Sequence, residues 1–467
     1  MTSLVNFFLN RSYYREAFLA ITIMFTISFF TPFSTILNLF LLLWGGVLIL
    51  EDFLTKRIIF KSKRCIPLIA FLAINLITLI INKDLNLFEN MKIFLLTVLQ
   101  FLVLFLFDSD DRRDTILNQI RRFNNIIITI TFVATSISLL VYMFGISFEI
   151  NGYIIGIQSG MLNGIYIGAN TAGPLVAISI VSSIINYQIR EARKLSKFDY
   201  INIIVQLVFL YMTNSRAALY CFIAFTIIIA LFYFRGIRKK VVSVGCVGVI
   251  YLLSKIVNKL MNIVYEGIHV IFKIIKYGFK KIISYITLNG NMNDAETSFL
   301  ENIVPSVSEV VEKDISMGFL NGRAQLWKCG LKIINDNLWF GVGSRNIPHV
   351  ALTYESISNL PGINGGGMHN IIIQTLVSNG VLGLLTLTIF IVPIILSYCR
   401  YFMKNGINSN NSKIILLIGS LLAMLLVNNM VEANILYSAT YMATVFWSYL
   451  GFGLFLIDND SRGDIND

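Results

Sequence analysis

Long apolar runs dominate this chain, and each has about the length that a membrane crossing needs. A hydrocarbon core about 30 Å thick requires roughly 20 apolar residues in an α-helix. Such runs must be helical, because an unpaired backbone amide in lipid costs several kcal/mol. We therefore predict an all-α, polytopic membrane protein with about twelve transmembrane helices. The expected spans are 14–32, 34–50, 65–82, 91–107, 125–145, 168–187, 200–215, 217–234, 238–254, 378–399, 413–430 and 435–457.

Composition supports lipid as the main solvent of the chain. Hydrophobic residues make up 56% of it, only 13% are charged, and the mean hydropathy is +0.73. Soluble globular chains are about a quarter charged. The formal net charge of +11 does not indicate nucleic acid, because the basic residues fall in short groups between apolar runs. The five cysteines form no CxxC pair, so neither a disulfide framework nor a zinc site is expected.

Lysine and arginine gather in alternate loops, which predicts the orientation of the chain in the membrane. Cytoplasmic loops of membrane proteins carry the excess of basic residues. We therefore expect both termini to be cytoplasmic, with the N-terminal run retained as a span in the inner membrane of a bacterium. The basic groups are Lys56, Arg57, Lys61, Lys63 and Arg64; Arg112, Arg113, Arg121 and Arg122; Arg190, Arg193, Lys194 and Lys197; Arg235, Arg238, Lys239 and Lys240; and Arg400, Lys404 and Lys413.

This orientation divides the chain into four parts. Residues 1–254 form an N-terminal transmembrane bundle of about nine helices, residues 255–370 a large extracytoplasmic loop, residues 371–457 the C-terminal transmembrane helices, and residues 458–467 a cytoplasmic tail. Long loops are usually functional or disordered.

A stripe of basic residues at steps of three and four marks 255–288, the beginning of that loop. This pattern favours an interfacial helix along the outer leaflet. Two alternatives stay open: the helix guides an anionic lipid substrate, or part of it spans the membrane.

Two arginines stand on the expected outer side. Arg216 lies in the turn Thr213-Asn214-Ser215-Arg216, where positive charge is scarce. Arg323 follows Gly322 and begins a helix that carries Trp327. Arginine at a helix start opposes the macrodipole, and an anionic partner would explain it. A guanidinium donates two parallel hydrogen bonds to phosphate oxygens. The alternatives are a snorkelling Arg216 and an Arg323 stacked on Trp327.

A glycine run precedes a histidine at the start of a late span. The stretch is Asn364-Gly365-Gly366-Gly367-Met368-His369-Asn370. The glycines allow a close backbone approach or a sharp turn. The positive end of the following helix disfavours imidazolium, which would leave His369 able to accept a proton. A lone histidine is more often structural than catalytic, but this one lies beside a glycine run at the membrane edge.

The remaining sequence patterns bear on which cofactors and which classes of protein are to be expected. No metal-ligand spacing and no Walker pattern is found in the sequence, so neither a metal nor a nucleotide cofactor is expected. The energy for any reaction would then come from the substrate. A polysaccharide flippase or other transporter is the alternative from another class. Transporters place ionisable residues near the bilayer midplane, whereas here they gather at one face.

These motifs together resemble the O-antigen polymerase and O-antigen ligase superfamily. The resemblance rests on Arg216, the segment Gly322-Arg323-x-x-x-Trp327 followed by Gly341-x-Gly343, and His369-Asn370 opening a late span. The stretch Ile167-Gly168-Ala169-Asn170-Thr171-Ala172-Gly173 is similar to another signature. Motif order, span number and the late outer loop also agree. The basic helix 255–288 matches no family motif.

The resemblance implies a metal-independent glycosyltransferase with a GT-C-like architecture and an extracytoplasmic active site. Its donor would be an undecaprenyl diphosphate-linked oligosaccharide, and its other partners membrane lipids, a chain-length regulator and a flippase. By the same resemblance, Arg216 and Arg323 would hold the diphosphate, and His369 would be the general base. Asn170, Trp327 and Asn370 would contact substrate. A polymerase is favoured over a ligase that transfers the chain to lipid A core.

Overall fold

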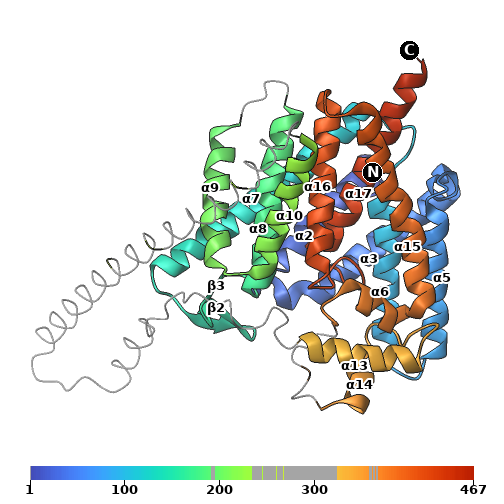
Figure 1. Ribbon diagram of the computed structural model, residues 1–467, viewed down its shortest axis with the longest axis vertical. Helices are drawn as coiled ribbons and strands as arrows, with labels where there is room; N and C mark the ends of the chain where they lie inside the picture. Colours follow the sequence, from blue (N-terminus) through green and yellow to red (C-terminus); the bar gives the residue numbers. More distant parts are fainter. Residues whose placement is uncertain are drawn as a thin grey trace, which may run out of the picture.

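The computed structural model describes residues 2–190, 195–233, 245, 259, 267, 323–356, 360, 363 and 367–466. Almost all of these residues belong to one helical assembly (Figure 1). The expected span at 238–254 and the basic stripe at 255–288 lie outside the described residues, apart from the isolated positions 245, 259 and 267. The helices are α1 (Thr2–Phe8), α2 (Arg11–Met24), α3 (Ser34–Glu51), α4 (Ile58–Lys61), α5 (Cys65–Ile81), α6 (Leu87–Leu99), α7 (Arg113–Met143), α8 (Ala169–Ile189), α9 (Lys197–Met212), α10 (Arg216–Tyr233), α13 (Arg323–Asp336), α14 (Ile347–Tyr354), α15 (Ile371–Asn405), α16 (Asn410–Asn429) and α17 (Tyr441–Asn466).

Eight helical stretches of the described residues are long and apolar enough to cross a membrane. The all-α, polytopic prediction is therefore confirmed. Two further expected spans form the shorter helices α5 and α9. The eight stretches are Ser28–Lys56, Leu87–Phe105, Arg113–Met143, Ala169–Ile189, Arg216–Tyr233, Ile371–Asn405, Asn410–Asn429 and Tyr441–Ser461.

The expected first span, 14–32, is not one helix. Helix α2 ends at Met24, and a 3-10 helix, η1 (Ser28–Phe33), follows with Pro32 inside it. Between them the backbone pairs with the segment before α8: Ser28 N–H donates to Ile165 O at 3.0 Å, and Ile167 N–H donates to Thr26 O at 2.9 Å. Hydropathy alone does not show such a break, because isolated Thr and Ser residues between Phe and Ile leave the average of the window apolar.

A small antiparallel sheet joins α7 to α8, which the sequence did not predict. Its strands β1 (Phe148–Ile150), β2 (Tyr153–Gln158) and β3 (Met161–Gly164) are ordered β1-β2-β3. The register pairs Glu149 with Ile154 in the first ladder and Ile157 with Leu162 in the second. The β3 strand leads directly into the start of α8.

Two of the short basic loops make described contacts with the C-terminal helices. Arg64, before α5, forms a bidentate ion pair with Asp458 of α17, with N···O distances of 2.6 and 2.8 Å. Arg113, at the start of α7, donates to Asn411 at 3.3 Å, next to the start of α16. Helix α17 continues through residues 458–466, the expected tail. Figure 1 shows that the C-terminus lies at the opposite end of the molecule from α13 and α14.

Helices α13 and α14 form a cap over the other end of the bundle (Figure 1). Their apolar faces and the first turns of α15 enclose a separate core that includes Leu326, Ile333, Ile347 and Met368. A Cβ atom on Gly330 of α13 would lie 2.9 Å from Cγ2 of Ile373. The cap is therefore packed closely onto the helix that follows His369.

The segment Gly341-Val342-Gly343 fastens the cap to a break in α15. Gly380 of α15 has non-helical backbone angles, φ 66° and ψ −169°. The break frees helix carbonyls, and Val342 and Gly343 donate their N–H groups to Val377 O and Ser378 O, each at 2.9 Å. Gly341 and Gly343 both have positive φ, which glycine adopts without a steric cost. This expected motif thus has a structural use in the fold.

Candidate functional site

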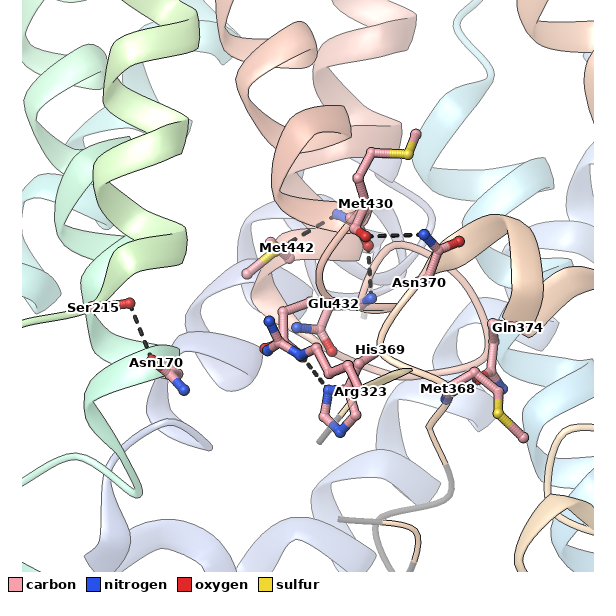
Figure 2. Close-up of polar contacts among 12 residues, drawn as sticks. Asn170, Ser215, Arg323, Met368, His369, Asn370, Gln374, Met430, Glu432 and Met442 are labelled. Atoms are coloured by element: carbon pink, nitrogen blue, oxygen red, sulfur yellow. Dashed lines mark hydrogen bonds and ion pairs between the residues drawn. The ribbon is translucent and has the colours of Figure 1, made fainter. Parts of the chain in front are cut away.

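One carboxylate joins two of the residues singled out from the sequence. Glu432 lies between Arg323 and His369 (Figure 2). Arg323 Nη2 donates to Glu432 Oε1 at 2.6 Å, and His369 Nδ1 lies 2.7 Å from Glu432 Oε2. The three side chains come from α13, from the turn before α15 and from the loop after α16. The site is partly open, with side-chain exposures of 20% for Arg323, 14% for Glu432 and 31% for His369.

The position of Arg323 follows from the packing of α13. Arg323 is the first residue of that helix, and Trp327 lies one turn later. Trp327 Nε1 donates to Met368 O at 2.9 Å, and Met368 N–H donates to Gln374 Oε1 at 2.7 Å. Trp327 therefore ties the helix of Arg323 to the turn that carries His369. Gly322, which the sequence motif includes, lies outside the described residues.

Backbone conformation and a helix cap fix His369. Its φ is +49°, in the left-handed region that is uncommon for a residue other than glycine. Asn370 is the N-cap of α15, and its Oδ1 accepts from the N–H groups of Ile372 and Ile373 at 2.9 and 3.1 Å. Asn370 Nδ2 donates to Met430 O at 3.0 Å. Asn370 thus links the start of α15 to the loop of Glu432 (Figure 2). Of the glycine run, Gly365 and Gly366 lie outside the described residues.

The loop between α16 and α17 holds Glu432 rigidly. Asn429 Oδ1 accepts from the N–H groups of Asn434 and Ile435 at 2.7 and 3.1 Å. Trp447 Nε1 donates to Ile435 O at 2.8 Å from inside the bundle. Glu432 N–H itself donates to Asn428 O at 2.9 Å. These bonds fix the backbone that carries the carboxylate.

Arg216 is the first residue of α10 and lies at the same end of the bundle. Cys221, five residues further along α10, accepts a hydrogen bond from Asn428 near the end of α16 at 3.2 Å. The start of α10 is therefore next to the end of α16, from which the loop of Glu432 departs. Ser215 Oγ donates to Asn170 Oδ1 at 3.2 Å (Figure 2). Asn170 thus holds the start of α8 against the start of α10.

The contact with Glu432 determines the tautomer of His369. An ionised carboxylate only accepts hydrogen bonds, so the proton of a neutral imidazole must be on Nδ1. Nε2 then carries the lone pair. This is the arrangement in which a carboxylate orients a histidine that takes a proton at its other nitrogen.

Glu432 is the site member that sequence reasoning did not identify as functional. Its position near an outer helix end was apparent, and it is the single acidic residue between Glu355 and Asp458. A lone acid in such a long apolar region is a signal that could have been used. Within the described residues, no group of three or more His, Cys, Asp or Glu side chains could hold a metal ion.

A comparison with protein families supports the superfamily resemblance. The family model described as O-antigen ligase matches residues 201–388. That range includes Arg216, Arg323 and His369, whereas Asn170 and Glu432 lie outside it. A search of curated proteins finds no significant match.

The matched range and the helical membrane fold agree with the resemblance drawn from the motifs. Residues 201–388 of the chain are therefore similar to the O-antigen ligase family, in agreement with the resemblance to the O-antigen polymerase and ligase superfamily.

Proposed function

We propose that the protein is a polysaccharide polymerase that acts on the outer face of the bacterial cytoplasmic membrane. It transfers a glycan from undecaprenyl diphosphate to a hydroxyl of a second lipid-linked repeat unit. The observation that carries this proposal is the contact of Glu432 with both Arg323 and His369. One site then presents a cation for the leaving diphosphate and a base for the incoming hydroxyl.

Helix ends support an anionic substrate at this place. Helices α10 and α15 begin at this end of the bundle, and Arg323 brings the start of α13 to the same place. The N-terminus of a helix carries a partial positive charge that favours phosphate. Arg216 and Arg323 add two permanent charges. This concentration of positive charge would stabilise a diphosphate as its negative charge develops.

The proposed reaction is a displacement at the anomeric carbon of the donor. The acceptor oxygen forms a bond to that carbon, and the bond from the carbon to the diphosphate oxygen breaks. The diphosphate leaves with the bonding electrons toward Arg216 and Arg323. The hydroxyl proton goes to Nε2 of His369, and Glu432 stabilises the imidazolium that forms. Metal is not needed for any of these steps.

A ligase is the second candidate, because the matched family model is described as O-antigen ligase. It would use the same donor chemistry and transfer the chain to lipid A core. The two functions differ in the acceptor and share the proposed roles of Arg216, Arg323 and His369.

One reconstitution separates these functions. Purified full-length protein receives a lipid diphosphate-linked repeat unit in the presence of EDTA, and the glycan length is measured. Longer glycan supports the polymerase, whereas transfer only when lipid A core is supplied supports the ligase. Movement of intact lipid across vesicles without transfer would contradict both and indicate a transporter. Alanine at Arg216, Arg323 or His369 should abolish product while the protein still inserts.

A further inference from the structure

A small cavity lies beside His369 and Glu432. Its volume is about 170 Å³. The described walls include His369 and Glu432 together with Ser344, Arg345 and Asn434, whereas Arg216 and Arg323 are not among them. An apolar cavity of about 150 Å³ is known to hold one benzene ring, so this volume has room for a single six-membered ring.

The cavity walls offer polar groups with spare hydrogen-bonding capacity. In the described ranges, no side-chain hydrogen bond is found for Ser344 or Asn434. Two other wall residues are already engaged: Gln374 Oε1 accepts from Met368 N–H, and Tyr437 Oη donates to Asn379 Oδ1 at 2.7 Å. The engaged groups fix the shape of the cavity, and the spare groups suit the hydroxyls of a sugar.

Arg345 gives this polar cavity an unbalanced positive charge. Both oxygens of Glu432 are occupied, one by Arg323 and one by His369. For Arg345, no carboxylate lies within ion-pair distance among the residues that the structure describes. A guanidinium stays charged at any physiological pH. The cavity therefore suits an anionic ligand better than a neutral one.

The backbone of Arg345 is held in place by α6. Arg345 N–H donates to Asn90 Oδ1 at 2.9 Å, and Asn86 Nδ2 donates to Arg345 O at 3.4 Å. Asn90 Nδ2 also donates to Asn346 Oδ1 at 2.9 Å. These bonds anchor the base of a long side chain at the rim of the cavity. The exposed side chain of Arg345 therefore extends from a fixed backbone position beside the cavity.

We propose that the cavity is the acceptor subsite and that Arg345 selects an acceptor sugar bearing a carboxylate, as in a uronic acid. This inference rests on the proposed function, since it takes His369 as the base for the acceptor hydroxyl. A ring seated here has one hydroxyl at His369, and its carboxylate lies against Arg345. Two parallel hydrogen bonds from the guanidinium then discriminate against the neutral ring.

Direct binding tests the subsite without turnover. The full-length protein is titrated with methyl glucuronide and with methyl glucoside, and affinities are measured by ligand-detected NMR. Hydrogen bonds to a charged group contribute about 1.5–3 kcal/mol, which converts to a preference of about tenfold or more for the glucuronide. Arg345→Gln should remove that preference, and Arg345→Lys should keep part of it. Lys332→Gln, which removes an exposed charge from the same cap, should change nothing.

Transfer kinetics then assign the ligand to the acceptor side. Two lipid-linked acceptors are compared, one with a terminal uronic acid and one with that carboxyl reduced to an alcohol. Arg345→Gln should raise KM for the acidic acceptor about tenfold or more and leave the donor KM and the reduced acceptor unaffected. A raised donor KM would place the diphosphate at Arg345 and overturn the proposal. Equal binding of both methyl glycosides by the unmodified protein would overturn it as well. Selective binding without any transfer would instead refute the proposed function and leave the anionic sugar site standing.

Discussion

Glu432 Oε2 lies 2.7 Å from His369 Nδ1, although the two residues are 63 positions apart in the chain. The other oxygen of Glu432 accepts from Arg323, which is 109 positions away. A single acid thus sets the tautomer of the histidine and the position of the arginine. If the site is catalytic, Glu432 should be as necessary as either of its neighbours.

Removing the carboxylate tests this directly. Glu432→Gln keeps the shape of the side chain but cannot stabilise an imidazolium, so turnover should fall by about 10²–10⁴-fold. The measurement is the rate of glycan elongation with purified protein. Glu355, at the end of α14, forms an ion pair with Lys332 at 3.9 Å and has no proposed role in the reaction, so Glu355→Gln should keep its activity. Equal rates for the Glu432 variant and the unmodified protein would show that His369 does not act as the base.

Lysine should not replace Arg323. The guanidinium gives one hydrogen bond to Glu432 and has further N–H groups for the diphosphate, whereas an ammonium cannot make the same planar, bidentate contact. We expect Arg323→Lys to lose at least about 1.5 kcal/mol of transition-state stabilisation, or about tenfold in kcat/KM for the donor. Lys328→Arg, on the exposed side of the same helix, is the matched control. Full activity of the lysine variant would mean that simple charge suffices.

Trp327 should support activity by holding His369 in position rather than by contacting substrate. Its Nε1 holds Met368 O, one residue before His369, and Trp327→Phe removes that bond but keeps an aromatic ring. Turnover should fall with the donor KM nearly unchanged, because the loss of about 1 kcal/mol of hydrogen bonding shifts the base and not the diphosphate site. Trp339→Phe is the control, since that side chain is 60% exposed. A raised donor KM would instead indicate that Trp327 contacts substrate.

Gly341 should tolerate no side chain. Its φ is +66°, and a Cβ atom would lie 2.5 Å from Val377 O. Gly341→Ala should therefore destabilise the cap by about 1–3 kcal/mol, from backbone strain and overpacking. Gly46, in α3, has no atom within 4 Å of the Cβ position, so Gly46→Ala should be neutral or stabilising by up to about 1 kcal/mol. Thermal unfolding in detergent compares the two, and similar losses for both variants would refute this account of the glycine motif.

The thiol of Cys329 reports on the same cap. Burial raises the pKa of Cys329, with nearby Lys332 opposing the shift, so less reactive thiolate is present at neutral pH than in an exposed cysteine. A variant with Cys329 as its single cysteine should react slowly with maleimide at pH 7, and faster as the pH rises through the raised pKa. Gly341→Ala in that background should speed the labelling. Rapid labelling of the parent at pH 7 would show that the cap is open in solution.

The apolar runs alone determined that this is a helical membrane protein, because a continuous apolar run of about 20 residues crosses lipid as a helix that pairs its own backbone amides. The basic loops predicted an orientation that stays a prediction, and two of them contact the C-terminal helices, through Arg64 with Asp458 and Arg113 with Asn411. The motifs also predicted the superfamily resemblance that the family model over residues 201–388 supports. The sequence alone was sufficient for these predictions, because hydropathy and charge are properties of each residue and do not depend on contacts between distant segments.

Only the tertiary structure decided what surrounds those motifs. Glu432 was visible as a lone acid, but its contacts with Arg323 and His369 depend on how α13, α15 and α16 pack. The break of α15 at Gly380 needs partners from Val342 and Gly343, which a helical hydropathy pattern does not contain. The expected first span failed for the same reason, since its backbone pairs with residues 165–167. Contacts between distant segments leave no local trace in composition or periodicity.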